Sequence, residues 1–457
     1  MRSAPKIISL NVGGQLFQTT PETLTLAGPN SILSSFSNLP LPQSSQPPPF
    51  IDRDPQLFSV FLSLLRTGNL PSKATAFHLQ DLISEAHFYG LQSLFISALG
   101  TTQSQFDPFA LQKSIILPLN GRDCPSAIAA TPSGSVHVAY GSKITSFDWS
   151  LQRKSTILTQ FPAIDSLLPI SPSAAATGAT DFPGLQILDL ETGAVLESLN
   201  WENEARSSST VQAIGSSPEF LFVTFESGRR NSNSIVLFDR TGSSLLPAAE
   251  IAHGEIYGPE LDSAIPATKL EWISSFKLLM ASGSHGGPSG LLGQIRLWDV
   301  RTCNAAWELK ERHDCFSDVT AAEDLSAIFK VGVNSGELFM IDLRKLGSGD
   351  QWIPLGSSGK RRNGKKEGGG CKIQGYGRHV FCTRGGDLEM WSEVLMVGAT
   401  KEDEVDESGR VFRRNWMGRE KDVGGSRITH MGFAGNKMVL CRKDQRAVEV
   451  WQSSARL

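Results

Sequence analysis

Residues 50–70 read FIDRDPQLFSVFLSLLRTGNL, and in this stretch three charged residues stand directly before a strongly apolar segment. Asp52, Arg53 and Asp54 precede Pro55, and the apolar residues after Pro55 recur at helical spacing. Pro55 suits the first turn of a helix because its missing N–H would be unpaired there anyway. We therefore predict a short strand followed by a helix, with two readings of the charges. They are either a solvated helix start or part of a polar surface that another copy of the chain contacts.

The segments on either side complete a small α/β domain. KIISLNV (6–12) alternates as a strand, Gly13-Gly14 allows the positive φ angles of a tight hairpin, and QLFQTT (15–20) returns as a second strand. Residues 1–100 carry few charges, so we expect part of the surface of this domain to be buried against a partner. Helices are predicted at PETLTLA (21–27), SILSSF (31–36) and DLISEAHFYGL (81–91).

Three segments carry a family resemblance in the same order: ISLNVGGQLFQTTPETL (8–24), FIDRDPQLFSVFLSLLRTGNLP (50–71) and LISEAHFYGLQSL (82–94). Together they resemble the BTB/POZ domain of the potassium-channel tetramerisation (KCTD-like) type over most of residues 6–100. The resemblance implies a homo-oligomeric ring of four or five copies. Channel members often bind zinc at the interface through His and Cys, but this chain has no Cys before Cys124, so we expect no metal there. The residues expected at the oligomer interface are Asn11, Gly13, Gly14, Asp52, Arg53 and Asp54.

The same resemblance implies a contact with a cullin. Many members of the family that are not channels act as substrate receptors of cullin-3 RING ligases, and they dock through an exposed apolar surface near the helices after the third strand. The helix after Pro55 carries more apolar residues than one core-facing stripe requires. We expect Phe58, Phe61 or Leu65 to contact the cullin, and a neighbouring subunit is the alternative cover for them.

The remaining part of the chain contains seven apolar hairpins, with a period of roughly 40 to 60 residues. The second strand of each ends in an acid or Trp, and only Trp298-Asp299 spells the WD signature fully. The Gly-His dipeptide that usually precedes the first strand of a WD repeat is missing from the expected places. We therefore predict a divergent seven-bladed WD-like β-propeller, with another all-β arrangement as the alternative. The hairpins are VHVAYG to KITSFD (136–148), AAATGA to LQILD (174–189), LFVTFESG to IVLFD (221–239), KLLMASGS to IRLWD (277–299), AIFKVGV to LFMID (327–342), HVFCTRG to LEMW (379–391) and KMVLCRK to VEVW (437–451).

The seventh hairpin has no outer strand after it, because only QSSARL follows VEVW. SIILPLN (114–120) lies before the first hairpin and belongs to no other blade. We assign it to blade seven, where it closes the ring and removes an exposed edge. The predicted domains are therefore a BTB/POZ domain at 6–100, a linker at 101–113 and an all-β propeller at 114–457.

Chemical motifs are scarce in this sequence. It has no GxSxG, HExxH or GxxxxGK[ST] motif, its eight His are dispersed, and its six Cys form no CxxC pair. The formal charge is −3, and no run of about 18 apolar residues occurs. We therefore expect no enzyme activity, no cofactor, no metal, no membrane contact and no nucleic acid. The expected location is the cytoplasm, with the nucleus as an alternative.

A basic cluster, GKRRNGKKEGGG (359–370), lies between the fifth and sixth hairpins. It is either a nuclear import signal or phosphate-contacting patch, or a solvated, flexible connection between blades. Its charged residues are Lys360, Arg361, Arg362, Lys365 and Lys366.

The combined domains predict a substrate-specific adaptor of a cullin-3 RING E3 ubiquitin ligase. In this hypothesis the BTB domain oligomerises and docks the cullin, while the propeller recruits a target protein of unknown identity. The alternative is a self-assembling scaffold or transcription cofactor without a ubiquitin-ligase role.

Overall fold

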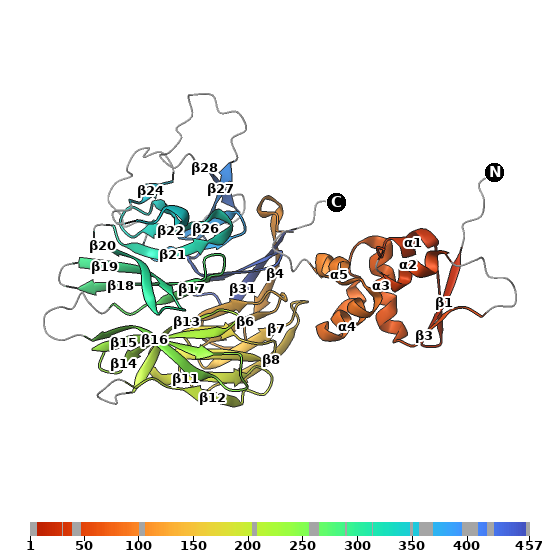
Figure 1. The fold of residues 1–457 in the computed structure, drawn as a ribbon, viewed down its shortest axis with the longest axis horizontal. Helices are drawn as coiled ribbons and strands as arrows, with labels where there is room; N and C mark the ends of the chain where they lie inside the picture. Colours follow the sequence, from red (N-terminus) through yellow and green to blue (C-terminus); the bar gives the residue numbers. More distant parts are fainter. Residues whose placement is uncertain are drawn as a thin grey trace, which may run out of the picture.

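The computed structural model describes residues 7–29, 31–38, 47–99, 106–202, 208–255, 265–287, 290–312, 314–347, 351–355, 369–394, 410–417 and 425–453. Figure 1 shows a small N-terminal domain beside a much larger ring of β-sheets. In that figure the N-terminal β-sheet lies on the side away from the ring, and α4 (Leu79–Tyr89) and α5 (Gln92–Leu99) lie toward it. No helix in the described ranges is long and apolar enough to cross a membrane.

The N-terminal domain is a three-stranded sheet covered by helices. Strand β1 (Ile8–Val12) is central, antiparallel to β2 (Gln15–Thr19) and parallel to β3 (Phe50–Ile51). The helices before α4 are α1 (Pro21–Thr25), α2 (Ile32–Ser35) and α3 (Pro55–Thr67). Helix α3 begins with Asp54 as its N-cap and ends at Gly68, whose φ of 71° lies in the left-handed region.

The apolar surplus of α3 is buried inside its own domain. Phe58 and Phe61 are 0% exposed and Leu65 is 2% exposed. Phe58 packs edge-on against Phe17 of β2, with ring centroids 4.9 Å apart, and also contacts Tyr89 of α4. The prediction that these three residues form an exposed cullin contact is therefore wrong. Helix α3 is covered on several sides, so it needs a wider apolar surface than one stripe.

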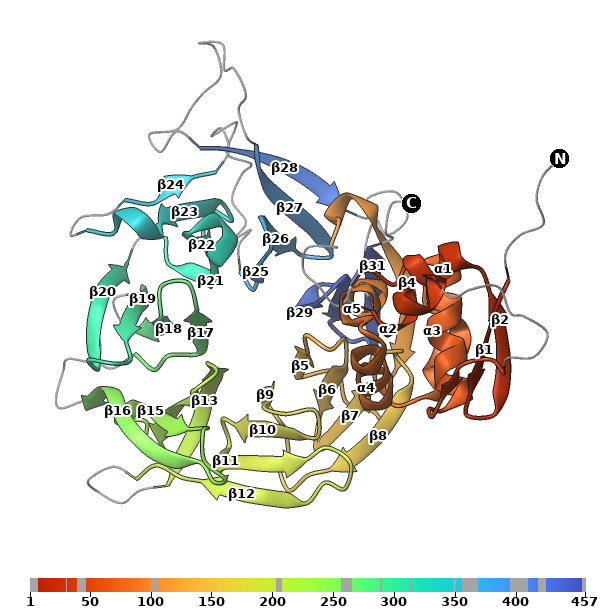
Figure 2. The same ribbon diagram turned by 45° about the vertical axis from the view of Figure 1, so that its right-hand side comes forward.

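The ring is a β-propeller, as predicted, and within the described residues its strands form seven blades of four antiparallel strands around a central axis (Figure 2). Blades two and three are joined into one sheet by the pairing of Pro183 with Thr210. Six blades are built from consecutive strands, and the seventh takes its outer strand from the start of the region. The first three blades are β5 (Ala127–Ala130), β6 (Val136–Tyr140), β7 (Lys143–Phe147) and β8 (Arg153–Leu158); β9 (Ser166–Pro169), β10 (Ala174–Ala179), β11 (Phe182–Asp189) and β12 (Val195–Leu199); and β13 (Ser209–Ser216), β14 (Phe220–Ser227), β15 (Ser232–Asp239) and β16 (Leu246–Glu255). The next two are β17 (Lys269–Ile273), β18 (Leu278–Gly287), β19 (Gly290–Asp299) and β20 (Asn304–Glu311); and β21 (Phe316–Ala322), β22 (Ala327–Gly332), β23 (Leu338–Asp342) and β24 (Ile353–Pro354). The last two are β25 (Ile373–Tyr376), β26 (His379–Arg384), β27 (Asp387–Val394) and β28 (Val411–Met417); and β29 (Ile428–Ala434), β30 (Lys437–Arg442), β31 (Ala447–Ser453) and β4 (Leu111–Pro118).

An acid at the end of the third strand in five blades fastens the turn to the outer strand. In each case a side-chain oxygen accepts the backbone N–H two residues later, as in an Asx turn. Hydrogen bonds from Thr192, and then from the Glu191 N–H, hold the pKa of Asp189 below the usual range, because they stabilise the ionised form. The N–H and hydroxyl of Thr241 do the same for the pKa of Asp239. The contacts are Ser150 N to Asp148 at 2.9 Å, Glu191 N to Asp189 at 2.9 Å, Thr241 N to Asp239 at 2.7 Å, Arg301 N to Asp299 at 3.0 Å and Arg344 N to Asp342 at 2.9 Å.

The ring is closed by β4, which pairs antiparallel with β31 and contains most of the segment predicted for this role at 114–120. The preceding residues also belong to the propeller. Phe106 is 9% exposed and packs against Tyr376, Phe381 and Phe433, with centroid distances of 5.0, 5.8 and 5.8 Å. The linker predicted at 101–113 therefore ends earlier in the structure, because its aromatic residue is buried between blades six and seven.

A buried histidine, His137, and a partly buried one, His430, are expected to make the propeller sensitive to acid. Burial lowers the pKa of His137 to about 4, helped by Lys154, and burial does the same for His430, helped by Lys372. Both are neutral in the native state, so their contribution is present above about pH 6.5 and is lost as the pH falls toward 4. Between pH 7 and pH 4.5 we expect a loss of about 2 kcal/mol from His137 and a smaller one from the partly exposed His430. Chemical denaturation at pH 7 and 4.5 should show this, and a His137→Gln variant should lose less stability on acidification than the wild type. An equal loss in both would contradict the assignment for His137.

Candidate functional site

The hairpin tip and the charged segment of the N-terminal domain meet in space. The backbone N–H of Gly13 donates to the carbonyl of Ile51 at 2.9 Å, and the N–H of Asn11 donates to Pro49 at 2.9 Å. Gly13 has φ +54°, and a Cβ there would stand 2.4 Å from the carbonyl oxygen of Arg53. A larger residue would therefore push the tip away from the segment. Gly14 has open space around it, and its φ of +89° alone accounts for glycine.

All three charged residues of the segment are exposed, and two of them have contacts within the chain. The guanidinium carbon of Arg53 lies 3.9 Å from the ring centre of Phe88, a cation–π contact. The Asp54 carboxylate accepts the N–H of Gln56 at 2.7 Å and caps α3. Asp52 has no hydrogen bond or ion pair with any described residue. Its place at an interface stays a prediction.

A buried acid behind this segment escaped the sequence analysis. Glu85 is 4% exposed, and its Oε2 has no hydrogen-bond partner among the described residues. Burial raises the pKa of Glu85, whereas nearby Arg53 lowers it and Asp54 raises it. The sequence does contain a signal for this burial. Glu85 occupies a position in the helical stripe that is otherwise formed by Leu82, Ala86 and Tyr89.

The outer face of the sheet presents an uncharged row across all three strands. Leu16, Asn11 and Phe50 stand side by side in register, so their side chains share one face. Leu16 is 63% exposed and Phe50 is 61% exposed. This outer sheet face, defined by Leu16, Asn11 and Phe50, belongs to the sheet that lies away from the propeller in both ribbon views (Figures 1 and 2). It is a candidate assembly surface that includes one predicted interface residue, Asn11.

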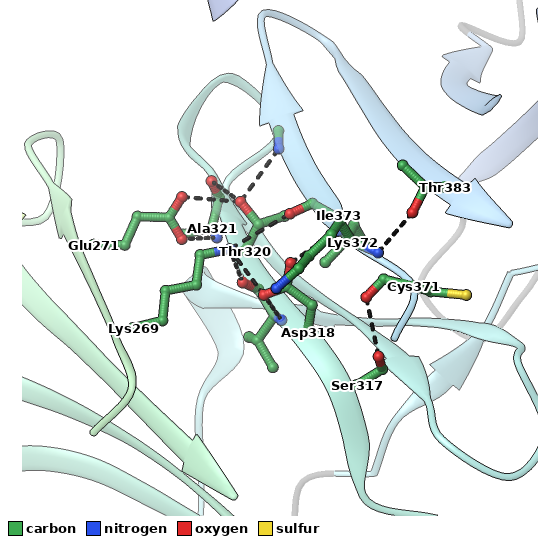
Figure 3. A network of polar contacts seen from close by, with 12 residues as sticks. Lys269, Glu271, Ser317, Asp318, Thr320, Ala321, Cys371, Lys372, Ile373 and Thr383 are labelled. Atoms are coloured by element: carbon green, nitrogen blue, oxygen red, sulfur yellow. Dashed lines mark hydrogen bonds and ion pairs between the residues drawn. The ribbon is translucent and has the colours of Figure 1, made fainter. Parts of the chain in front are cut away.

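Polar side chains tie together the inner strands of three propeller blades (Figure 3). The ammonium group of Lys269 on β17 lies 3.1 Å from Asp318 Oδ1 on β21 and donates to the carbonyls of Val319 and Ile373 at 2.5 and 3.4 Å. The other carboxylate oxygen of Asp318 accepts the N–H of Ile373, at the start of β25, at 3.0 Å. These bonds link blades four, five and six at the centre of the ring.

A second carboxylate continues the same network. Glu271, also on β17, accepts the Thr320 hydroxyl and the Ala321 N–H, both at 2.9 Å. Thr320 in turn accepts the N–H of Gly375 at 3.2 Å. These contacts all lie within the chain, so the network stabilises the arrangement of the blades.

A cavity of about 230 Å³ opens beside this network, lined by inner strands of several blades, with Asp165, Lys269 and His430 among its residues. Lys269 directs its donors into the protein, and Asp165 accepts two hydrogen bonds from Thr180. In the described ranges no group of three or more His, Cys, Asp or Glu side chains could hold a metal ion. The predicted basic cluster at Lys360, Arg361, Arg362, Lys365 and Lys366 lies outside the described residues.

Comparison with known proteins agrees with the two-domain architecture. The family model described as "BTB/POZ domain" matches residues 8–99, and the model described as "At2g24240-like, C-terminal beta propeller" matches residues 120–400. The chain is 57% identical over 455 residues to BTB/POZ domain-containing protein At5g41330 of Arabidopsis thaliana, covering 98% of this chain and 97% of that protein. It is 29% identical to At4g30940 of the same plant over 75% of this chain and 77% of that protein. It is also 35% identical to human KCTD21 over 25% of this chain and 44% of that protein.

The fold and these matches define a BTB/POZ protein of KCTD-like type with a C-terminal β-propeller. The chain belongs to the family with the At2g24240-like propeller.

Proposed function

We propose that this protein is a substrate-specific adaptor of a cullin-3 RING E3 ubiquitin ligase. The BTB domain assembles several copies and docks the cullin, and the propeller recruits the protein to be modified. The observation that carries this proposal is the joining of a KCTD-like BTB domain to a propeller in one chain. Neither domain presents a catalytic set among the described residues, which favours an adaptor or scaffold over an enzyme.

The burial of Phe58, Phe61 and Leu65 requires a different cullin contact. Exposed apolar residues on the helical part of the domain include Leu26 at 64%, Ile32 at 43% and Ile83 at 38%. Ile83 lies on α4, which faces the propeller in Figure 1, whereas Leu26 and Ile32 lie at α1 and α2, farther from it. We therefore assign the cullin contact to Leu26 and Ile32.

A binding experiment with the N-terminal domain of cullin-3 tests this proposal. We expect Leu26→Asp with Ile32→Asp to weaken binding at least about tenfold, because two apolar anchors become charged. Ile83→Asp is the matched control and should bind like the wild type. If the wild-type protein shows no affinity for cullin-3, the scaffold or transcription-cofactor alternative replaces the ligase role.

We also propose a cytoplasmic location, with nuclear import through the basic cluster as the alternative. A fluorescent fusion carrying Lys360→Ala, Arg361→Ala and Arg362→Ala distinguishes them. Loss of nuclear signal in this variant relative to the wild type would identify an import signal.

A further inference from the structure

A turn of the first propeller blade reaches the apolar core of the N-terminal domain. Trp149, between β7 and β8, is half-buried and packs against the cluster that contains Phe58, Phe61 and Tyr89. The two ribbon views place the α4–α5 side of this domain toward the propeller (Figures 1 and 2). Trp149 is therefore a contact between the two domains.

The turn that carries Trp149 is held in a defined shape. The carboxylate of Asp148 accepts the N–H groups of Ser150 and Gln152, both at 2.9 Å. The N–H of Asp148 donates to the carbonyl of Gln152 at 2.9 Å, and Leu151 adopts a φ of 64° within the turn. Because the backbone is fastened at both ends, the indole reaches the N-terminal domain with little further loss of conformational freedom.

A buried lysine from the last blade supports the same turn. Lys437, on β30, is 6% exposed, and its ammonium group donates to the carbonyl oxygen of Trp149 at 2.6 Å. Gly134 lies beside them: a Cβ there would be 3.4 Å from the ammonium nitrogen and 3.8 Å from Trp149 Cα. The φ of Gly134 is +87°, which favours glycine. The absence of a side chain allows the β5–β6 turn that carries Gly134 to lie close to Trp149. The position of Trp149 is thus supported from blades one and seven.

The covalent connection holds the domains together at a second place. Helix α5 ends at Leu99, and Phe106 is already buried between blades six and seven. Seven residue steps of at most about 3.6 Å each allow a separation of about 25 Å. The N-terminal domain is therefore restrained by this short connection and by the Trp149 contact.

We propose that Trp149 is a docking residue that locks the propeller and the BTB domain of the same chain into one rigid arm. The surface it occupies is the apolar cluster of its own N-terminal domain, reached from the α4–α5 side. In an assembly of several copies, each propeller would then stand at a fixed orientation instead of moving on a tether. This inference concerns the joint within one chain and does not depend on cullin binding.

Trp149→Ala in the full-length protein tests the contact between the two domains, with Leu158→Ala as the matched control. Leu158 ends the next strand of the same blade and is 67% exposed, so its loss should leave the joint intact. In Trp149→Ala we expect cleavage within residues 100–105 by proteinase K to accelerate on the order of tenfold, because the two domains separate more often. Small-angle scattering should show a larger radius of gyration at unchanged oligomer mass.

A second variant keeps the test decisive if the turn itself is disturbed. Lys437→Met retains the indole but removes the ammonium that holds its carbonyl, and we expect a smaller acceleration of the same cleavage. Hydrogen exchange of α4 and α5 should rise in both variants, while exchange of the propeller strands β14 and β18 stays unchanged. If Trp149→Ala and Lys437→Met both match the wild type in cleavage, scattering and exchange, the proposal is wrong.

Discussion

Deletion of residues 111–118 is expected to destroy the cooperative folding of the propeller and to make the protein aggregate. This segment is β4, the outer strand of blade seven, and it pairs with β31 from Ala447 to Ser453. Without it, β31 becomes an edge whose backbone groups are open to pairing with other chains. The buried Leu111 and Leu117 are lost at the same time. We expect a loss of more than about 5 kcal/mol, comparable to the whole stability of a typical domain.

Differential scanning calorimetry and size-exclusion chromatography measure this outcome. Deletion of residues 39–46, an equally long Pro/Ser/Gln-rich segment of the N-terminal part, is the control, and we expect its propeller transition to be unchanged. A 111–118 deletion that stays soluble and melts in one sharp propeller transition would show that β4 does not close the ring.

A point variant should weaken the pairing of β4 with β31 to a smaller degree. Glu449 on β31 is 4% exposed and lies 2.8 Å from the ammonium of Lys113 on β4 and 3.1 Å from Arg442. Arg442 is itself only 5% exposed, so Glu449→Gln would leave a buried guanidinium without its counter-charge. Breaking a buried pair in this way costs about 3–5 kcal/mol. The variant should therefore melt well below the wild type but remain folded.

The seven inner hairpins could be predicted from the sequence because their strands are mostly buried. Strands β6, β10, β22 and β30 contain no exposed residue, and most of their residues are apolar, so each reads as a mainly apolar segment. The acid at the end of the third strand adds a second signal with a physical reason, because it caps the next turn in five blades. These two signals together fixed the blade number and left one strand over for closure.

Outer strands were harder to predict, because they have solvent on one side and little alternation. Five consecutive residues of β4, from Gln112 to Ile116, are exposed, although two of them are isoleucine. In the fifth blade the outer strand β24 has only two residues, Ile353 and Pro354. Proline lacks the N–H that a longer ladder needs.

Errors in the N-terminal domain arose where burial depends on tertiary packing. The apolar surplus of α3 suggested an exposed contact, but Phe17 from β2 and Tyr89 from α4 cover Phe58. Glu85 was overlooked because a charged residue is normally assigned to the surface, whereas here it lies under Arg53 and Asp54. A single sequence does not show which helices meet, so these contacts appear only in three dimensions.

Charge introduced on the outer sheet face is expected to dissociate the proposed homo-oligomer. Leu16→Asp with Phe50→Asp places two carboxylates in the row around Asn11, where the wild-type face is uncharged. Both positions are more than half exposed in the single chain, so the domain itself should still fold. If a second copy covers this face, both charges must be buried without partners, which costs several kcal/mol at every contact. Multi-angle light scattering should then show the mass of one chain in place of four or five.

Charge reversal distinguishes the outer sheet face from the charged segment Asp52–Asp54, which was predicted to form the interface. Asp54 caps α3 and Arg53 packs on Phe88, so Asp52 is the residue of the three that can be reversed with the least disturbance. Asp52→Lys should lower the oligomer mass only if a charged group of the next copy faces it, since like charges in contact repel. Asp324→Lys, the same change on an exposed residue of the propeller, is the control. Dissociation by Asp52→Lys but not by the double aspartate variant would place the interface at the charged segment and the hairpin tip. A wild-type protein that is already a single chain at micromolar concentration would refute assembly through either surface.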